Sequence, residues 1–520
     1  MREDVEEFDA YLDHLGQALG HADRHAGLKG YCSGLVLPLS RKSVEPMAAH
    51  IDPLHASAKH QSLHHFVAKA EWSDTAVLQR IREWVMPALD AHAGEETGYY
   101  WIIDDTGFPK KGRHSVGVAR QYCGQLGKQD NCQVAVSLSI ATQRGSLPIA
   151  WQLYIPKEWI DDPERARRAG IPDDLSFETK PQIALAQLRE AIASGVTRGI
   201  VLADAGYGDE TAFRDGITEL GLLYAVGIRP GTSVWAPGTA PLPPKPWNGR
   251  GKPPTLLRRV PGHEPLAVKE LAMQLPVNTW QTVTWREGSN AALSSRFAAV
   301  RVRPAHRDYW RNTVRDEEWL LIEWPDGDTE PLKYFLTTAP EEATLEQLVF
   351  VTKMRWRIER DYQDLKQEFG LGHYEGRGWR GFHHHATLSI AAYGFLMAQR
   401  LRMQSDVRDK KTSSNARCLP FPRSTSHGAV QRAQRHVPDS ITHDAYPAWT
   451  TAHATMALFL CGNRRRSQLS DTVRLANRIH AWRPFPIETK SLQSASGAIH
   501  ARNPAPRFDE VARACESVDT

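Results

Sequence analysis

Cysteine is scarce in this sequence of 520 residues, and its spacing is irregular. No C-x-x-C pair occurs among the six cysteines, which are Cys32, Cys123, Cys132, Cys418, Cys461 and Cys515. Disulfide-stapled secreted folds and zinc ribbons need closely spaced cysteines, so the sequence excludes both classes. Scattered free thiols are typical of a reducing compartment, and we expect the protein in the cytoplasm.

Long apolar runs are also missing. No stretch approaches the roughly 18 apolar residues that a membrane-spanning helix requires. The longest candidate, residues 386–401, is shorter and is better interpreted as a buried core helix. The first segment, MREDVEEFDAYLDHLGQALG, is acidic and amphipathic and lacks the charged and apolar regions of a signal peptide. We therefore expect neither export nor a membrane partner.

An excess of acidic charge is absent as well. The chain has 64 Lys and Arg against 60 Asp and Glu, which gives a formal net charge of +4. Residues 391–480 contain 14 Lys and Arg against 5 Asp, so the positive charge is concentrated late in the chain. This distribution is compatible with a polyanionic partner, but it does not identify one.

Changes in periodicity and composition divide the chain into five segments. Helical spacing dominates the first segment, strands alternate with helices in the second, and Pro- and Gly-rich turns separate strands in the third. The fourth begins with a long helix, and the fifth is basic and poorly periodic. The predicted boundaries are 1–95, 96–228, 229–340, 341–404 and 405–520.

The second segment predicts the fold class. Three strand candidates at 98–107, 131–142 and 145–156 precede a helix at 180–195 and a strand at 198–208 that is apolar on both faces. A three-strand meander followed by a crossover helix and a central parallel strand suggests a ribonuclease H-like mixed-sheet core. We therefore predict an α/β (α+β) protein with an N-terminal helical region and a β-rich insertion.

Acidic residues lie on one of these predicted strands and at the end of another. The segment VLADAGYGD (201–209) ends its strand at Asp204, and WIIDDTG (101–107) carries Asp104 and Asp105. Successive residues of a strand face opposite sides, so only one of the adjacent pair can point into a shared site. The two strands are neighbours in the predicted topology, which brings two carboxylates together. Asp209, farther along, is expected to cap the helix that follows.

A third acid lies on the long helix. Arg355, Glu359, Tyr362 and Lys366 follow one another at offsets of 4, 7 and 11 residues from the first, which puts them on one helical face. One interpretation is a solvated ladder of ion pairs. The other is a metal-binding Glu359 whose cationic neighbours hold a phosphate backbone. Mg²⁺ prefers carboxylate oxygens, and two such ions activate water and stabilise the leaving oxygen in phosphodiester cleavage.

Three sequence segments together resemble bacterial insertion-sequence transposases of the DDE type. They are DDTGFPKKGRHSVGVARQYCGQLGKQDNCQVAVSLS, VLADAGYGD and RWRIERDYQDLKQEFGLGHYEGRGWRGFHHH, and the resemblance covers roughly residues 30 to 400. In that family the first Asp stands in a D-x-[ST] context. Asp104 satisfies it and Asp105 is the close alternative, while Asp204 and Glu359 match the other two positions.

The resemblance implies a cofactor and partners. The acids would bind Mg²⁺, two ions per site with Mn²⁺ as an alternative, and the protein would cleave and transfer DNA strands. The partner would be double-stranded DNA, both element ends and target, bound by a homodimer that is nucleoid-associated when on DNA. Residues 1–95 would bind the ends. The family pattern Tyr-x-x-Arg-x-x-x-Glu-x-x-x-x-x-x-Lys fits Arg355, Glu359 and Lys366, but Thr352 replaces its Tyr.

Basic and aromatic residues near these acids are candidate DNA contacts. They are Lys110, Lys111, Arg113, Arg120, Arg355, Tyr362, Lys366 and Trp379. The loop 108–122 is either a phosphate-binding loop or a solvated β-hairpin, and Trp379, in a glycine- and histidine-rich loop, either stacks on a base or packs in the core. His383, His384 and His385 are expected at the beginning of a helix or facing DNA, because consecutive side chains diverge and rarely bind one metal ion.

Two other functions remain open from the sequence. A transposase-derived regulator would bind DNA without cutting it, and a stand-alone nuclease of the same core would cut without joining. The irregular composition after about residue 405 adds the alternative of a divergent or frame-altered end in an inactive protein.

Overall fold

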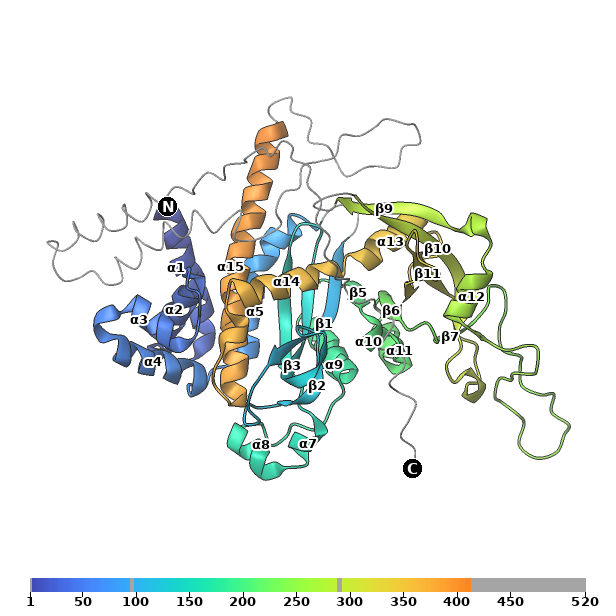
Figure 1. Ribbon diagram of the computed structural model, residues 1–520, viewed down its shortest axis with the longest axis horizontal. Helices are drawn as coiled ribbons and strands as arrows, with labels where there is room; N and C mark the ends of the chain where they lie inside the picture. The colour runs from blue at the N-terminus through green and yellow to red at the C-terminus, as the bar shows by residue number, and fades with distance from the viewer. Residues whose placement is uncertain (1, 94–97, 288–291, 413–520) are drawn as a thin grey trace, which may run out of the picture. The chain divides into compact units, whose positions relative to one another are not determined.

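The computed structural model describes residues 2–93, 98–287 and 292–412 (Figure 1). Most of the predicted basic C-terminal segment, from residue 413 onward, therefore lies outside the described residues.

The N-terminal region is helical, as predicted. Its helices are α1 (Arg2–Gly16), α2 (Asp23–Val36), α3 (Val44–Ile51), α4 (Ala56–Ala68) and α5 (Asp74–Asp90). Helix α5 begins where the Ser73 side chain accepts a hydrogen bond from the backbone N–H of Ala76, and its apolar residues face the core. Helices α2, α4 and α5 pack against a long helix near the other end of the described chain, α15 (Trp379–Thr412).

A mixed sheet forms the centre of the fold. Its first six strands are β1 (Tyr99–Pro109), β2 (Ala119–Cys123), β3 (Lys128–Ala141), β4 (Ser146–Leu153), β5 (Gly199–Ala203) and β6 (Tyr224–Ile228). Strand β1 lies between β3, which is antiparallel to it, and β5, which is parallel. Strand β5 also pairs in parallel with β6. This arrangement confirms the predicted fold class, a mixed-sheet core of the ribonuclease H-like type.

Helices connect and cover these strands. They are α7 (Lys157–Ile160), α8 (Pro163–Ala169), α9 (Lys180–Ala193), α10 (Ala205–Gly208) and α11 (Thr211–Glu219). Helix α9 begins with a capping box in which Thr179 and Gln182 satisfy each other's backbone N–H groups. It is followed by Gly195 in the left-handed region, at φ 71°, a backbone conformation that glycine adopts readily at the end of a helix.

The predicted β-rich insertion continues the core sheet. It contains β7 (Ser233–Trp235), β8 (Leu266–Ala267), α12 (Val268–Gln274), β9 (Gln281–Glu287), β10 (Ala292–Pro304), β11 (Glu318–Trp324) and β12 (Lys333–Thr337). Strand β12 pairs with β6, so that within the described residues 12 strands join one sheet. The insertion and the core therefore share backbone hydrogen bonds.

The long helix predicted from residue 341 is interrupted. It consists of α13 (Leu345–Lys353) and α14 (Trp356–Gln367). At the junction the hydrogen bonds tighten to a three-residue spacing, from Arg357 N–H to the Met354 carbonyl and from Ile358 N–H to the Arg355 carbonyl. After this break, α14 packs against β1 and β4 (Figure 1).

Helix α15 begins earlier than predicted. The glycine- and histidine-rich composition of the interval 379–385 favours a loop, yet this interval forms the first two turns of α15, with His383, His384 and His385 all buried. Their rings contact backbone groups of neighbouring elements instead of facing DNA. Among the helices that the structure describes, none is long and apolar enough to span a membrane.

Candidate active site

Two neighbouring strands place two acids side by side. Parallel pairing of β1 with β5 sets Ile102 opposite Leu202, and two residues farther on the strands reach Asp104 and Asp204. Parallel strands lie roughly 4.8 Å apart, so acids at matching positions are neighbours. The Asp204 carboxylate also caps α10 by accepting the Gly206 N–H at 2.9 Å.

The adjacent acids of β1 face opposite sides of the sheet. Asp104 points toward α14, where its Oδ2 lies 2.9 Å from an Arg355 guanidinium nitrogen. Asp105 points toward α9 and α10, where its Oδ2 accepts hydrogen bonds from Lys180 Nζ at 3.0 Å and from the Tyr207 hydroxyl at 3.2 Å. The two carboxylates therefore belong to different surroundings, and only Asp104 shares a face with α14.

Arg355 connects Glu359, the third acid, to Asp104. Its second terminal nitrogen lies 2.6 Å from Glu359 Oε1, so that one guanidinium bonds both Asp104 and Glu359. Burial lowers the pKa of Arg355, but the charges of Asp104, Glu359 and Asp204 outweigh burial and raise it. The interaction of one cation with all three acids shows that strand, strand and helix converge here.

The pKa of Asp104 reflects its burial and the negative charges close to it. Burial raises its pKa to about 7, Arg355 opposes that shift, and the nearby charges of Asp204 and Asp105 add to it. A second cation would favour the ionised form of this carboxyl. Because burial and the neighbouring acids disfavour the ionised form of Asp104, we expect the site to bind a positively charged ligand.

The donor set suits a hard divalent cation, but it is not assembled around one. Carboxylate oxygens are the ligands that Mg²⁺ and Mn²⁺ prefer. In the described part of the chain, no three His, Cys, Asp or Glu side chains lie close enough together to hold an ion as they stand. Arg355 lies between Asp104 and Glu359, so these two acids can share an ion only after Arg355 moves.

The candidate DNA residues after β1 divide into exposed and inward-facing groups. Lys111, Arg113 and Arg120 are exposed between β1 and β3. Lys110 is half-buried, and its Nζ donates to the Tyr374 carbonyl at 3.2 Å. The first three therefore offer charge to a ligand, whereas Lys110 joins the loop to the segment before α15.

The candidates on α14 and α15 are more enclosed. Tyr362 is only 8% exposed, and its hydroxyl hydrogen-bonds with Ser137 of β3 at 2.8 Å, so its side chain belongs to the core. Lys366 donates to the Gly107 carbonyl at 2.8 Å and to Gln125 Oε1 at 3.0 Å. Trp379 is half-buried, with its ring 4.1 Å from that of His383.

Two residues near the site have no clear signal in the sequence. Lys180 opens α9 and Tyr207 lies in α10, and both bond to Asp105. Only the small residues around Tyr207 in AGYG mark it as unusual. The expected helix cap at Asp209 is wrong, because its carboxylate accepts the Thr232 hydroxyl at 2.6 Å and Glu210 stands at the N-cap of α11.

The close approach of α10 to β6 makes a testable prediction. A methyl group at Gly208 would overlap the carbonyl oxygen of Gly227 and lie 2.7 Å from the Val226 side chain. We expect Gly208→Ala to lower the free energy of unfolding by about 1–3 kcal/mol through overpacking, measured by urea denaturation. Gly231→Ala is the matched control, because its added methyl meets nothing within 4 Å. Equal stability of the two variants would contradict this packing.

The mixed sheet, with one acid within β1, another directly after the neighbouring β5 and a third on the covering helix, defines a ribonuclease H-like protein. A family model described as DDE superfamily endonuclease matches residues 14–292, and the chain belongs to this family. The matched range contains Asp104 and Asp204 and ends before Glu359. Glu359 is therefore a candidate on its position beside Arg355.

A similar protein carries a transposase name. The chain is 33% identical over 198 residues to the protein of Microchaete diplosiphon named "Probable transposase for insertion sequence element IS701". The matched stretch covers 38% of this chain and 47% of that relative, so the similarity spans about half of the relative's length.

Proposed function

We propose that this protein is a transposase that cleaves and joins DNA at the ends of its own insertion element. The convergence of Asp104, Asp204 and Glu359 around Arg355 carries the proposal. The endonuclease family of the chain and the name of its relative support it. Strand cleavage would produce 3′-hydroxyls, which would then attack target DNA directly.

The three acids are the proposed metal ligands. Enzymes of this superfamily use divalent metal ions, and we propose two Mg²⁺ held by Asp104, Asp204 and Glu359. When bound, such ions supply an activated water and stabilise the leaving oxygen. Arg355 keeps two of the acids paired in the free protein and contacts a DNA phosphate when they are released. Lys366 and the exposed Lys111, Arg113 and Arg120 are further phosphate contacts.

Asp105 receives a different role from Asp104. It faces away from α14 and bonds Lys180 and Tyr207. Tyr207 is three residues beyond Asp204, so its bond to Asp105 fixes α10 and with it the carboxylate of Asp204. We propose that Asp105 is a positioning residue.

Assembly and segment roles complete the proposal. The N-terminal region, predicted as 1–95, binds the element ends, and the core is completed by the segment predicted as 341–404. The protein acts on double-stranded DNA as a homodimer and associates with the nucleoid in the cytoplasm.

The decisive experiment uses DNA from the flanks of the gene. A labelled duplex that carries the flanking inverted repeat is incubated with the full-length protein, a target plasmid and Mg²⁺. We expect strand breaks with free 3′-hydroxyls at the repeat and covalent joining to the plasmid, both blocked by EDTA because the acids then lose their cation. Denaturing gels measure both products.

The same assay separates the competing functions. Cleavage without joining would identify a stand-alone nuclease, and binding without metal-dependent cleavage would identify a regulator. Either result would overturn the proposal. Added target DNA of unrelated sequence controls for nonspecific nicking.

A further inference from the structure

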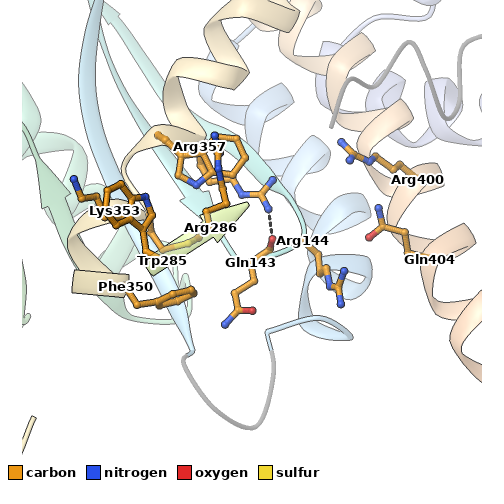
Figure 2. A pocket seen from close by; sticks show the side chains of 11 residues that line it. Gln143, Arg144, Trp285, Arg286, Phe350, Lys353, Arg357, Arg400 and Gln404 are labelled. Atoms are coloured by element: carbon orange, nitrogen blue, oxygen red, sulfur yellow. Dashed lines mark hydrogen bonds between the residues drawn. The ribbon is translucent and has the colours of Figure 1, made fainter. Parts of the chain in front are cut away.

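A basic pocket lies on another side of the helix that carries Glu359. It has a volume of about 160 Å³ and is built by four segments that are distant in the sequence: the β3–β4 turn, β9, the α13–α14 junction and α15. Its charged and aromatic lining includes Arg144, Trp285, Arg286, Lys353, Arg357 and Arg400 (Figure 2). We call this set the basic pocket.

The pocket is separate from the three acids. Arg355 directs its guanidinium to Asp104, whereas Arg357 directs its own to the Gln143 carbonyl in the β3–β4 turn (Figure 2). Residues two apart on a helix point about 200° from each other, so the helix stands between the two sites. The turn can approach α15 because Gly145 has no side chain, and a methyl there would meet Met397 Sδ at 2.8 Å.

The lining is cationic on every side. Five of its eleven residues are Lys or Arg and none is Asp or Glu. Lys353 is paired with Glu323 at 2.7 Å, just outside the lining. Two buried acids outside the lining interact electrostatically with its arginines, Asp361 with Arg357 and Asp364 with Arg400. Arg144 is exposed and Arg286 is half-buried, and neither forms an ion pair with a carboxylate of the described residues.

The aromatic rings of the pocket are covered by cations. The guanidinium of Arg286 lies over the ring of Trp356 at 4.0 Å, and that of Arg357 at 4.6 Å. Lys353 lies over the ring of Trp285 at 4.2 Å. These contacts hold the positive groups in place and leave the rings poorly placed to stack on a base. The space is also smaller than the roughly 300–1,000 Å³ typical of pockets for organic ligands.

We infer that the basic pocket binds a backbone phosphate of duplex DNA, away from the bond that is cleaved. A phosphate is small, anionic and matched to arginine forks. The site lies beside the α13–α14 junction, so a strand held there is anchored to the same helix as Glu359. The inference rests on the proposed function only in taking DNA as the ligand.

Salt dependence of binding tests this directly. A fluorescent duplex of arbitrary sequence is titrated with the full-length protein in EDTA over a series of salt concentrations. We expect Arg286→Gln and Arg144→Gln each to weaken binding. The double variant should reduce the slope of log K against log salt by about 0.9 for each phosphate that the protein no longer neutralises. Arg286→Lys keeps the charge and should retain most of the slope.

The control and the contrary results are equally specific. Lys269→Gln removes an exposed cation of α12 that is paired with Glu330 and does not line the pocket, so it should leave the slope unchanged.

Weaker binding of the pocket variants with an unchanged slope would mean that the pocket contacts an uncharged group, and unchanged binding would mean that it contacts no DNA. Both results overturn the inference while leaving wild-type binding intact. Absence of wild-type binding would instead reject the proposed function as well. Arg144 is exposed, so its variant remains informative if Arg286→Gln destabilises the fold.

Discussion

Replacing Asp104 with asparagine is expected to lower the rate of strand cleavage at least about a thousandfold, a loss of roughly 4 kcal/mol in transition-state stabilisation. The change keeps the shape of the side chain but removes the charge that faces Asp204 and Arg355. Glu359→Gln should have an effect of the same order. Single-turnover cleavage at saturating protein measures it.

Asp105→Asn is the matched control for Asp104→Asn. The asparagine side chain at position 105 keeps an oxygen for the Tyr207 hydroxyl and loses only the ion pair with Lys180. We expect a loss of about 10- to 100-fold, of the size seen when groups that orient metal ligands are changed. Tyr207→Phe should cause a similar decrease. If Asp105→Asn were the more damaging of the two acidic variants, the assignment of Asp104 would fail.

Acid should unfold this protein through two buried histidines. His383 Nδ1 faces the Trp379 carbonyl at 3.0 Å, and its Nε2 accepts the Leu153 N–H at 3.2 Å. This pattern requires a neutral ring. His385 is similarly placed between the Tyr31 hydroxyl at 2.8 Å and the Gly370 carbonyl at 2.9 Å. Burial lowers the pKa of both histidines to about 4.

The sign of the effect follows from linkage. The unfolded chain takes up a proton at each histidine below its ordinary pKa of about 6.5, whereas the native ring stays neutral until about pH 4. The contribution to stability is complete above pH ~6.5 and is lost as the pH falls toward ~4, by about 3 kcal/mol for each histidine. Urea denaturation across this pH range measures the loss.

Substitution isolates this contribution. His383→Gln removes the titrating group and keeps an acceptor for the Leu153 N–H, so the free energy of unfolding should depend less on pH by about one proton. His114→Gln, at an exposed loop position, should leave the pH dependence as in the wild type. The explanation would be wrong if His383→Gln lost stability in acid as steeply as His114→Gln and the unchanged protein.

Several features were predictable because they depend on neighbouring residues. Thr179 and Gln182 mark the beginning of α9, and Gly195 follows its end, since capping and left-handed termination are local. The apolar run before Asp204 likewise indicated a central strand, and the strand–strand–strand–helix–strand order predicted the pairing of β1 with β5.

Other features depend on contacts between distant segments. The break between α13 and α14 lies in a continuous helical pattern, and Tyr362 follows the spacing of an exposed stripe although its hydroxyl is bonded to Ser137. The insertion joins the core sheet through β12 and β6, which no local pattern specifies. The basic pocket gathers four segments whose sequences are individually ordinary.

The sequence by itself determined that acids lie on one strand and directly after another and that a third lies on a later helix, because strand period and helical spacing are local properties of the chain. It also narrowed the candidates for the first acidic position to Asp104 and Asp105. Only the tertiary structure decided which side of β1 faces α14, and it placed Asp104 against Arg355 and Asp105 against Lys180. The facing of a strand is set by the elements that pack on each side of the sheet, and those lie about 75 and 251 residues away.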